Sequence, residues 1–283
     1  MIEIKNLCFG YKKSKNVLEN VNLNLKKGCI HGLFGKNGVG KTTLLKLIGG
    51  LQFPDKGEVK VGKFTPSERK VAFLADMSFI SEELYDSHLT IEKYVKINSV
   101  FYPNFSQQDF EAYLKDFEIE DTKQYLHKLS YGTKKKIFIS FGLACHCKLI
   151  LLDEPTNGLD IPSKSQFRKV ILRAMSDETC VVISTHQVRD LHNLIDSVLI
   201  LDDTNVLLNA TSEEICNKLF FGICDTLQSK EEMLYSEDDV RGLKTKHSVH
   251  SSLLELIKMA PAGLLFFKLK NTSNEEYISK IKV

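Results

Sequence analysis

The stretch Gly35 to Thr42, GKNGVGKT, has the composition of a phosphate-binding loop. It fits the pattern G-x-x-x-x-G-K-[ST], and it lies between an apolar run typical of a strand and a run with helical spacing. Its glycines let successive backbone N–H groups turn toward phosphate oxygens, and the following helix presents the positive end of its dipole. The loop residues predicted to cradle phosphate are Gly35, Lys36, Asn37, Gly38 and Gly40.

The residues that close this loop carry side chains suited to a triphosphate. Lys41 is predicted to reach the β- and γ-phosphates, and the Thr42 hydroxyl to hold Mg²⁺. Thr43 adds a contact near the α-phosphate. We therefore expect a nucleoside triphosphate and Mg²⁺ at this place.

Two other predicted strands end in acidic or basic residues that could act on a bound triphosphate. The run LILLDEP places Asp153 at the carboxyl end of a buried strand, where ligands of open α/β sheets bind. Asp153 is predicted to hold Mg²⁺ through water, and Glu154 to accept a proton from the attacking water. The run VVISTH ends another strand with His186, whose imidazole faces the γ-phosphate in this interpretation. Each feature alone also fits a structural turn, but beside the phosphate loop they favour hydrolysis.

Apolar runs of strand length alternate with helical patterns, which predicts a largely parallel sheet covered by helices. We expect strands in the stretches VNLNL, CIHGLF, KVAFLAD, KLILLD, CVVIST and SVLILD. The stretch KTTLLKLIGG has helical spacing and stops at paired glycines. The amino-terminal stretch MIEIKNLCFG alternates in polarity and predicts a strand, not a signal peptide.

The pattern changes twice along the chain. Amphipathic helix patterns predict a helical subdomain at about residues 77–147, inserted in a cassette of residues 1–210. Ser106 is predicted to be the N-cap of one of its helices. Residues 211–283 predict a small α+β accessory region. It opens with a capping serine in TSEEICNKLF, and short strands and a helix at SSLLELIKMA follow.

Composition excludes several classes of protein. The chain has 283 residues, 43% hydrophobic and 26% charged, with a formal net charge of +2, so no basic excess argues for nucleic acid. Its seven cysteines are scattered and odd in number, which favours a reducing cytoplasm over a disulfide framework. Cys145 and Cys147 flank His146, but no second ligand cluster follows, so we expect a buried, inert pair.

Taken together, these motifs resemble those of the ATP-binding cassette (ABC) proteins, the nucleotide-binding subunits of ABC transporters. The resemblance covers roughly residues 1–205. GKNGVGKTT resembles Walker A, LILLDEP Walker B, NGLD the D-loop that ends at Asp160, and His186 the switch histidine. LSYGT, residues 129–133, resembles the family signature, whose Ser130 and Gly132 contact the γ-phosphate held by the opposite cassette. The resemblance implies ATP as the nucleotide.

The sequence departs from the family pattern in three places. Tyr131 stands for a glycine and Thr133 for a glutamine of the signature. Asp76, at the end of KVAFLAD, stands where the Q-loop usually carries glutamine, and it is expected to ligate through water or to act by its backbone. The lysines that follow the signature, Lys134 to Lys136, are expected on a solvated helix face. Tyr11 matches the aromatic residue that stacks on adenine, with Phe9 as the alternative.

The resemblance implies a P-loop α/β cassette with an antiparallel β portion at the amino terminus, an inserted helical subdomain and a small carboxyl-terminal appendage. It also implies that the cassette hydrolyses ATP to power a transporter. Two cassettes sandwich ATP, as a homodimer or heterodimer, on the cytoplasmic face of the membrane. No apolar run reaches the ~18–20 residues that span a bilayer, so a separate transmembrane subunit is expected. The motifs look more like those of export systems than importers. A soluble ABC ATPase that acts on ribosomes or DNA, and a nucleotide sensor without turnover, remain alternatives.

Overall fold

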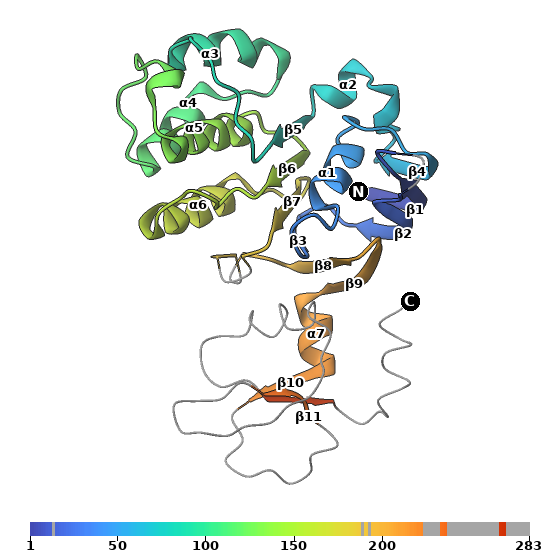
Figure 1. Ribbon diagram of the computed structural model, residues 1–283. Helices are drawn as coiled ribbons and strands as arrows, with labels where there is room; N and C mark the ends of the chain where they lie inside the picture. The colour runs from blue at the N-terminus through green and yellow to red at the C-terminus, as the bar shows by residue number, and fades with distance from the viewer. Residues whose placement is uncertain (13–14, 188–189, 192–193, 223–232, 237–265, 270–283) are drawn as a thin grey trace.

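The computed structural model describes residues 1–12, 15–187, 190–191, 194–222, 233–236 and 266–269 (Figure 1). A six-stranded sheet forms its centre, in the order β5-β6-β7-β3-β8-β9. All neighbouring pairs are parallel except β8 and β9. The strands are β3 Cys29–Phe34, β5 Met77–Ile80, β6 Leu149–Asp153, β7 Cys180–Thr185, β8 Ser197–Asp202 and β9 Asn205–Thr211.

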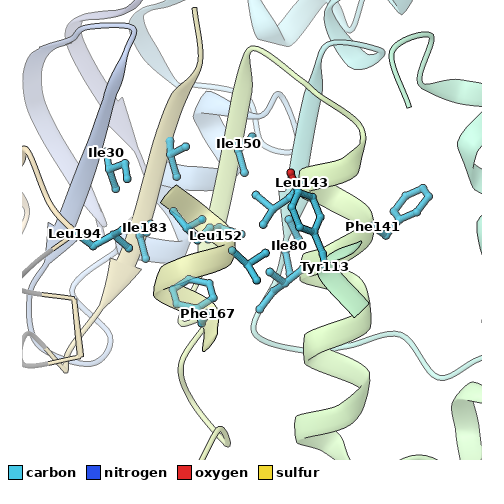
Figure 2. Close-up of a cluster of buried hydrophobic side chains, with 14 of the residues drawn as sticks. Ile30, Ile80, Tyr113, Phe141, Leu143, Ile150, Leu152, Phe167, Ile183 and Leu194 are labelled. Atoms are coloured by element: carbon cyan, nitrogen blue, oxygen red, sulfur yellow. The ribbon is translucent and has the colours of Figure 1, made fainter. Parts of the chain in front are cut away.

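The central strands are buried on both faces, which explains their continuous apolar runs. Because side chains alternate along a strand, Ile150 and Leu152 of β6 point to one face and Leu149 and Leu151 to the other. The first face packs under helices: Figure 2 shows Leu152 together with Tyr113 of α4 (Gln107–Asp116) and Phe167 of α6 (Ile161–Ala174).

The second face carries α1 and a separate antiparallel sheet at the amino terminus, as predicted. That sheet has the order β2-β1-β4, with β1 Ile2–Phe9, β2 Leu18–Leu25 and β4 Lys56–Val61. Helix α1, Lys41–Ile48, contributes Leu44, Leu45, Leu47 and Ile48 to the core between the two sheets. This packing fixes α1, and the loop before it, at the middle of the large sheet.

The predicted helical segment lies between β5 and β6 (Figure 1). It contains α3 Ile91–Asn98, α4 and α5 Tyr131–Ala144, with 3₁₀ turns at Ser99–Phe101 and Leu126–Lys128. Ser106 is the N-cap of α4, as predicted, and its Oγ accepts a hydrogen bond from the Asp109 amide at 3.1 Å. Residues 77–80, which we assigned to the subdomain, pair with β6 as part of the large sheet.

The prediction of a strand at KVAFLAD is wrong. Residues Val71–Leu74 form a short helix, α2, after a 3₁₀ turn at Pro66–Glu68, and the strand is the next stretch, β5. Within α2, Phe73 is buried while Val71 is 82% exposed, so the run is amphipathic around a helix. A short apolar run does not by itself separate strand from helix.

The accessory region begins with α7, Ser212–Lys218. Its cap is Thr211 and not the predicted serine: Thr211 Oγ1 accepts from the Glu214 amide at 3.1 Å, and the Thr211 amide donates to Glu214 Oε2 at 2.8 Å. Strands β10 Leu219–Gly222, β11 Met233–Ser236 and β12 Phe266–Leu269 form a small antiparallel sheet. The predicted helix at residues 251–260 lies outside the described residues.

In the described part of the chain, none of the helices combines the length and the apolar composition needed to cross a membrane.

Candidate nucleotide-binding site

The phosphate-binding loop joins the end of β3 to the start of α1, at the centre of the sheet. Its glycines have positive φ angles, 155° at Gly35 and 107° at Gly40. A Cβ atom on Gly35 would lie 2.5 Å from the Leu201 carbonyl oxygen, so the backbone path excludes a side chain there. Gly40 is the N-cap of α1 and offers no capping side chain. The first amides of α1 therefore have no side-chain cap from Gly40 and suit an anion.

Lys41 is held inside the loop and is only 7% exposed. Its Nζ donates to the carbonyl oxygens of Gly35, at 2.8 Å, and Lys36, at 3.1 Å. Burial lowers the pKa of Lys41, and the carboxylates of Glu154 and Asp153 oppose that shift. The side chain is thus folded back on its own loop, beside the acidic end of β6.

Thr42 and Asp153 meet across the loop. Thr42 Oγ1 donates to Asp153 Oδ2 at 2.8 Å, and Ser184 Oγ donates to the other carboxylate oxygen. The parallel register places Asp153 opposite Ser184, which explains the second contact. Asp153 is 2% exposed. A hydroxyl and a carboxylate oxygen side by side form the donor set that Mg²⁺ prefers, so these residues fit the predicted metal.

Glu154 directly follows β6 and adopts a positive φ of 45°. Its amide donates to the Ser184 carbonyl oxygen at 3.0 Å. Its Oε1 lies 3.0 Å from His186 Nδ1 and 3.7 Å from Lys41 Nζ. The predicted base, the predicted histidine and the loop lysine are therefore in one cluster.

These groups line a cavity of about 490 Å³. The Tyr11 hydroxyl and Thr43 Oγ1 are 3.1 Å apart at its edge, and Tyr11 is 58% exposed. Phe9, the alternative aromatic, is buried in the core. The lining residues are Tyr11, Val17, Asn37, Gly38, Gly40, Lys41, Thr42, Thr43, Glu82, Glu154, Asn157 and His186.

Three of the predicted signature and D-loop residues, Ser130, Gly132 and Asp160, do not line this cavity, whereas Asn157 at the start of the D-loop does. Ser130 is exposed and caps α5, its Oγ accepting from the Thr133 amide at 3.1 Å. Asp160 is exposed and caps α6, accepting from the Ser163 amide at 2.9 Å. Gly132 lies against the loop between β6 and α6: a Cβ there would be 2.9 Å from the Gly158 carbonyl oxygen. These three residues therefore do not contribute to the cavity of their own chain.

Asp76 also lies away from the cavity. It precedes β5, so it is at the amino ends of the parallel strands, whereas the phosphate loop, Asp153 and Thr185 are at their carboxyl ends. Its carboxylate accepts from the Lys148 amide at 2.9 Å and from Lys148 Nζ at 3.1 Å. Asp76 was expected at the carboxyl end of a strand KVAFLAD. That stretch forms α2, and Asp76 instead lies just before β5, so its predicted position is wrong.

Glu82 is a cavity residue that the sequence reasoning missed, as it missed Val17 and Asn157. It follows β5 at the carboxyl edge, lines the cavity, and accepts from Asn157 Nδ2 through Oε1 at 2.9 Å. The available signal was the acidic pair after MSFI, a four-residue strand with a serine inside it.

The expected solvated face of Lys134 to Lys136 is wrong as well. Lys135 is fully buried. Lys134 is ion-paired with Asp86, and Lys136 Nζ lies 5.9 Å from the centre of the Phe117 ring. The run of positive charge is therefore packed against the protein.

Cys145 and Cys147 are buried, as expected. Burial raises the pKa of Cys147 to about 12, with a smaller contribution from Asp76, so its thiol stays protonated at neutral pH.

Comparisons with known proteins agree with this architecture. The sequence model of the family described as "ABC transporter" matches residues 18–157. The chain is 31% identical over 224 residues to the ABC transporter ATP-binding protein YtrB of Bacillus subtilis (strain 168), covering 76% of this chain and 74% of that one. It is 29% identical over 216 residues to the SkfA peptide export ATP-binding protein SkfE of the same organism, covering 73% and 87%. A solved structure of an ATP-binding subunit of an ABC transporter superposes with a TM-score of 0.69 at 26% identity, over 77% of this chain and 92% of that one.

Proposed function

Since the chain belongs to the ATP-binding subunits of ABC transporters, we propose that it binds MgATP in the cavity at the phosphate loop and hydrolyses it between two cassettes. Such a subunit is an ATPase that powers a membrane transporter. The observation that carries the assignment of roles is that Lys41 and His186, which are far apart in the sequence, both approach Glu154 Oε1, at 3.7 Å and 3.0 Å.

The loop amides and Lys41 bind the phosphates, and Tyr11 supplies a flat surface for the adenine ring. Thr42 and Asp153 hold Mg²⁺, which neutralises charge on the transferred phosphoryl group when bound. Glu154 accepts the proton of the attacking water, and His186 holds the carboxylate of Glu154 from the other side. Turnover, and not sensing alone, is favoured because the base lies at the phosphate lysine. The sensor alternative rested on Asp76, which lies elsewhere.

The second half of the nucleotide site comes from another cassette. Ser130, Gly132 and Asp160 lie at the starts of α5 and α6, outside the chain's own cavity. A second chain facing this one supplies the same residues to the bound ATP. A homodimer and a heterodimer both satisfy this geometry.

A separate transmembrane chain is the proposed partner of the helical segment. A second cavity, of about 190 Å³, opens between β5 and α5 and is lined by aromatic side chains, among them Tyr85, Tyr94, Tyr102 and Phe138. Tyr85 is 75% exposed, and nearby Phe101 is 66% exposed. A partly open surface with exposed aromatic side chains of this kind fits a protein partner. We place the subunit on the cytoplasmic face of the membrane. Export is the proposed direction, because SkfE is named for peptide export.

Replacement of the loop lysine tests the proposed site. Lys41→Ala should abolish ATP binding or nearly so, because the phosphates lose their main cation. Lys46→Ala, in the last turn of the same helix, is the matched control and should bind ATP normally. Titration of the purified proteins with a fluorescent ATP analogue measures the affinity. Equal affinity of Lys41→Ala and wild type would reject the site.

A further inference from the structure

We propose that Lys135 is a positioning residue for hydrolysis: from the second turn of α5, it holds the main chain of Glu154 so that the carboxylate faces the nucleotide. The proposal rests on the role of Glu154 given above. It assigns to the signature helix a direct contact with the base of the same chain.

The main chain of Glu154 needs such support. Its φ of 45° is uncommon for a residue with a side chain, and such a conformation persists only where the surroundings fix it. On one side the Glu154 amide donates to the Ser184 carbonyl oxygen at 3.0 Å. On the other side Lys135 Nζ donates to the Glu154 carbonyl oxygen at 2.5 Å. The two contacts hold the peptide units on both sides of the Cα atom.

Lys135 is suited to this task because its ammonium group is fully engaged. The side chain is fully buried. Besides Glu154, Nζ donates to the Tyr131 hydroxyl at 3.2 Å and to the Asn157 carbonyl oxygen at 3.4 Å. These three acceptors match the three protons of an ammonium group. A buried charge is tolerated only with such partners, so Lys135 and the turn after β6 fix each other.

The same cluster joins α5 to two segments that line the cavity, the one at Glu82 and the turn after β6. Tyr131, one helical turn before Lys135, donates its hydroxyl to the Glu82 carbonyl oxygen at 2.6 Å. Asn157 donates its side-chain amide to Glu82 at 2.9 Å. A displacement of α5 relative to the sheet must therefore move the turn that carries Glu154. This contact makes the position of the base depend on the position of the helical segment.

Lys135→Met tests the proposal, because methionine keeps the length of the stem and removes every donor. We expect kcat for ATP hydrolysis to fall about 10²-fold, the scale of a misplaced catalytic group, with little change in ATP affinity. Lys136→Met, the next residue of α5, is the control and should keep the wild-type kcat. Lys135→Arg retains the charge and should recover part of the loss. An unchanged kcat in Lys135→Met would overturn the proposal.

A double variant separates positioning from a general loss of structure. If Lys135 acts through Glu154, Lys135→Met should lower the residual rate of Glu154→Gln by no more than about twofold, since the base is already absent. A full additional 10²-fold loss would show a role independent of Glu154 and overturn the proposal. Should Lys135→Met fail to fold, Lys135→Gln, which removes the charge, takes its place in both comparisons. If the wild-type chain binds ATP without hydrolysing it in any assembly, the proposed function fails first; active wild type with active Lys135→Met rejects only this inference.

Discussion

Glu154 lies between Lys41 and His186, and both side chains approach the same carboxylate oxygen. Lys41 Nζ is 3.7 Å from Oε1, and His186 Nδ1 is 3.0 Å from the same atom. At the scale of single residues, these distances support the proposed division of roles, in which Lys41 binds phosphate and Glu154 accepts a proton.

We expect Glu154→Gln to retain ATP and to hydrolyse it about 10²-fold more slowly or worse, the range of a lost general base. Glutamine keeps the shape of the side chain but does not take up the proton of water. Glu111→Gln, on the exposed side of α4, is the control. Phosphate release from purified proteins at saturating ATP measures the rate. A normal rate in Glu154→Gln would move the base elsewhere, with His186 as the next candidate.

Lys135 also predicts a pH dependence of stability. Burial lowers its pKa to about 8 from the usual 10.5, although Glu82, Glu154 and Asp153 raise it. Between these two values the unfolded chain binds more protons at this site than the folded chain, so the site's contribution to the free energy of unfolding increases with pH. In urea unfolding without nucleotide, the free energy of unfolding of the wild type relative to that of Lys135→Met should therefore increase as the pH rises through about 8. A difference independent of pH would contradict this.

At the scale of elements, the order of strands explains why distant motifs meet. Strands β6, β7 and β3 are neighbours and parallel, so their carboxyl ends bring Asp153, Thr185 and the phosphate loop to one edge. The motif spacing and the strand-like runs were sufficient to predict this edge. The positions of Asp153, Glu154, His186 and Lys41 follow from rules that act over a few residues.

Two features depended on tertiary packing and escaped prediction. The run VAFLA was interpreted as a strand, but it is a helix in which Phe73 is buried and Val71 and Ala72 are exposed. The four residues of β5, which do pair, include Ser78. Because of that error, the sequence analysis assigned Asp76 to the cavity, where the structure has Glu82. The buried Lys135 was hidden in a lysine run, although it lies one turn before Ile139, a core residue. Charge alone suggested solvent, and spacing was the better guide.

The second cavity, between β5 and α5, is the surface that we propose contacts the membrane partner. Tyr85→Arg should lower ATP hydrolysis about tenfold or more in membranes that contain the partner, because the variant removes an exposed aromatic side chain from the proposed contact and adds a charge there. Hydrolysis by the isolated chain should not change. Val71→Arg, at an 82% exposed position of α2, is the control. Cross-linking should place partner contacts within residues 77–127. Contacts confined to residues 211–283 would give the coupling role to the accessory region.

At the scale of the whole molecule, one chain contains both halves of a nucleotide site but does not bring them together. The cavity gathers the phosphate loop and the base, while Ser130 caps α5 outside it. In the proposed function, a chain by itself therefore lacks the signature contact to its own ATP. We expect efficient hydrolysis to require a second cassette, and this dependence can be tested by mixing defective chains.

We expect Ser130→Arg and Lys41→Ala each to be nearly inactive as a homodimer. In a mixed dimer, one composite site combines the intact loop of the first chain with the intact signature of the second, and the other site carries both lesions. Mixing should restore part of the activity, measured as phosphate release against the ratio of the two chains. Because restoration requires that identical chains pair, ATP-dependent dimerisation of Glu154→Gln is first measured by size-exclusion chromatography. If that dimer forms and no mixture recovers activity, Ser130 does not act across the interface, since a loop and a signature that serve different chains must complement each other.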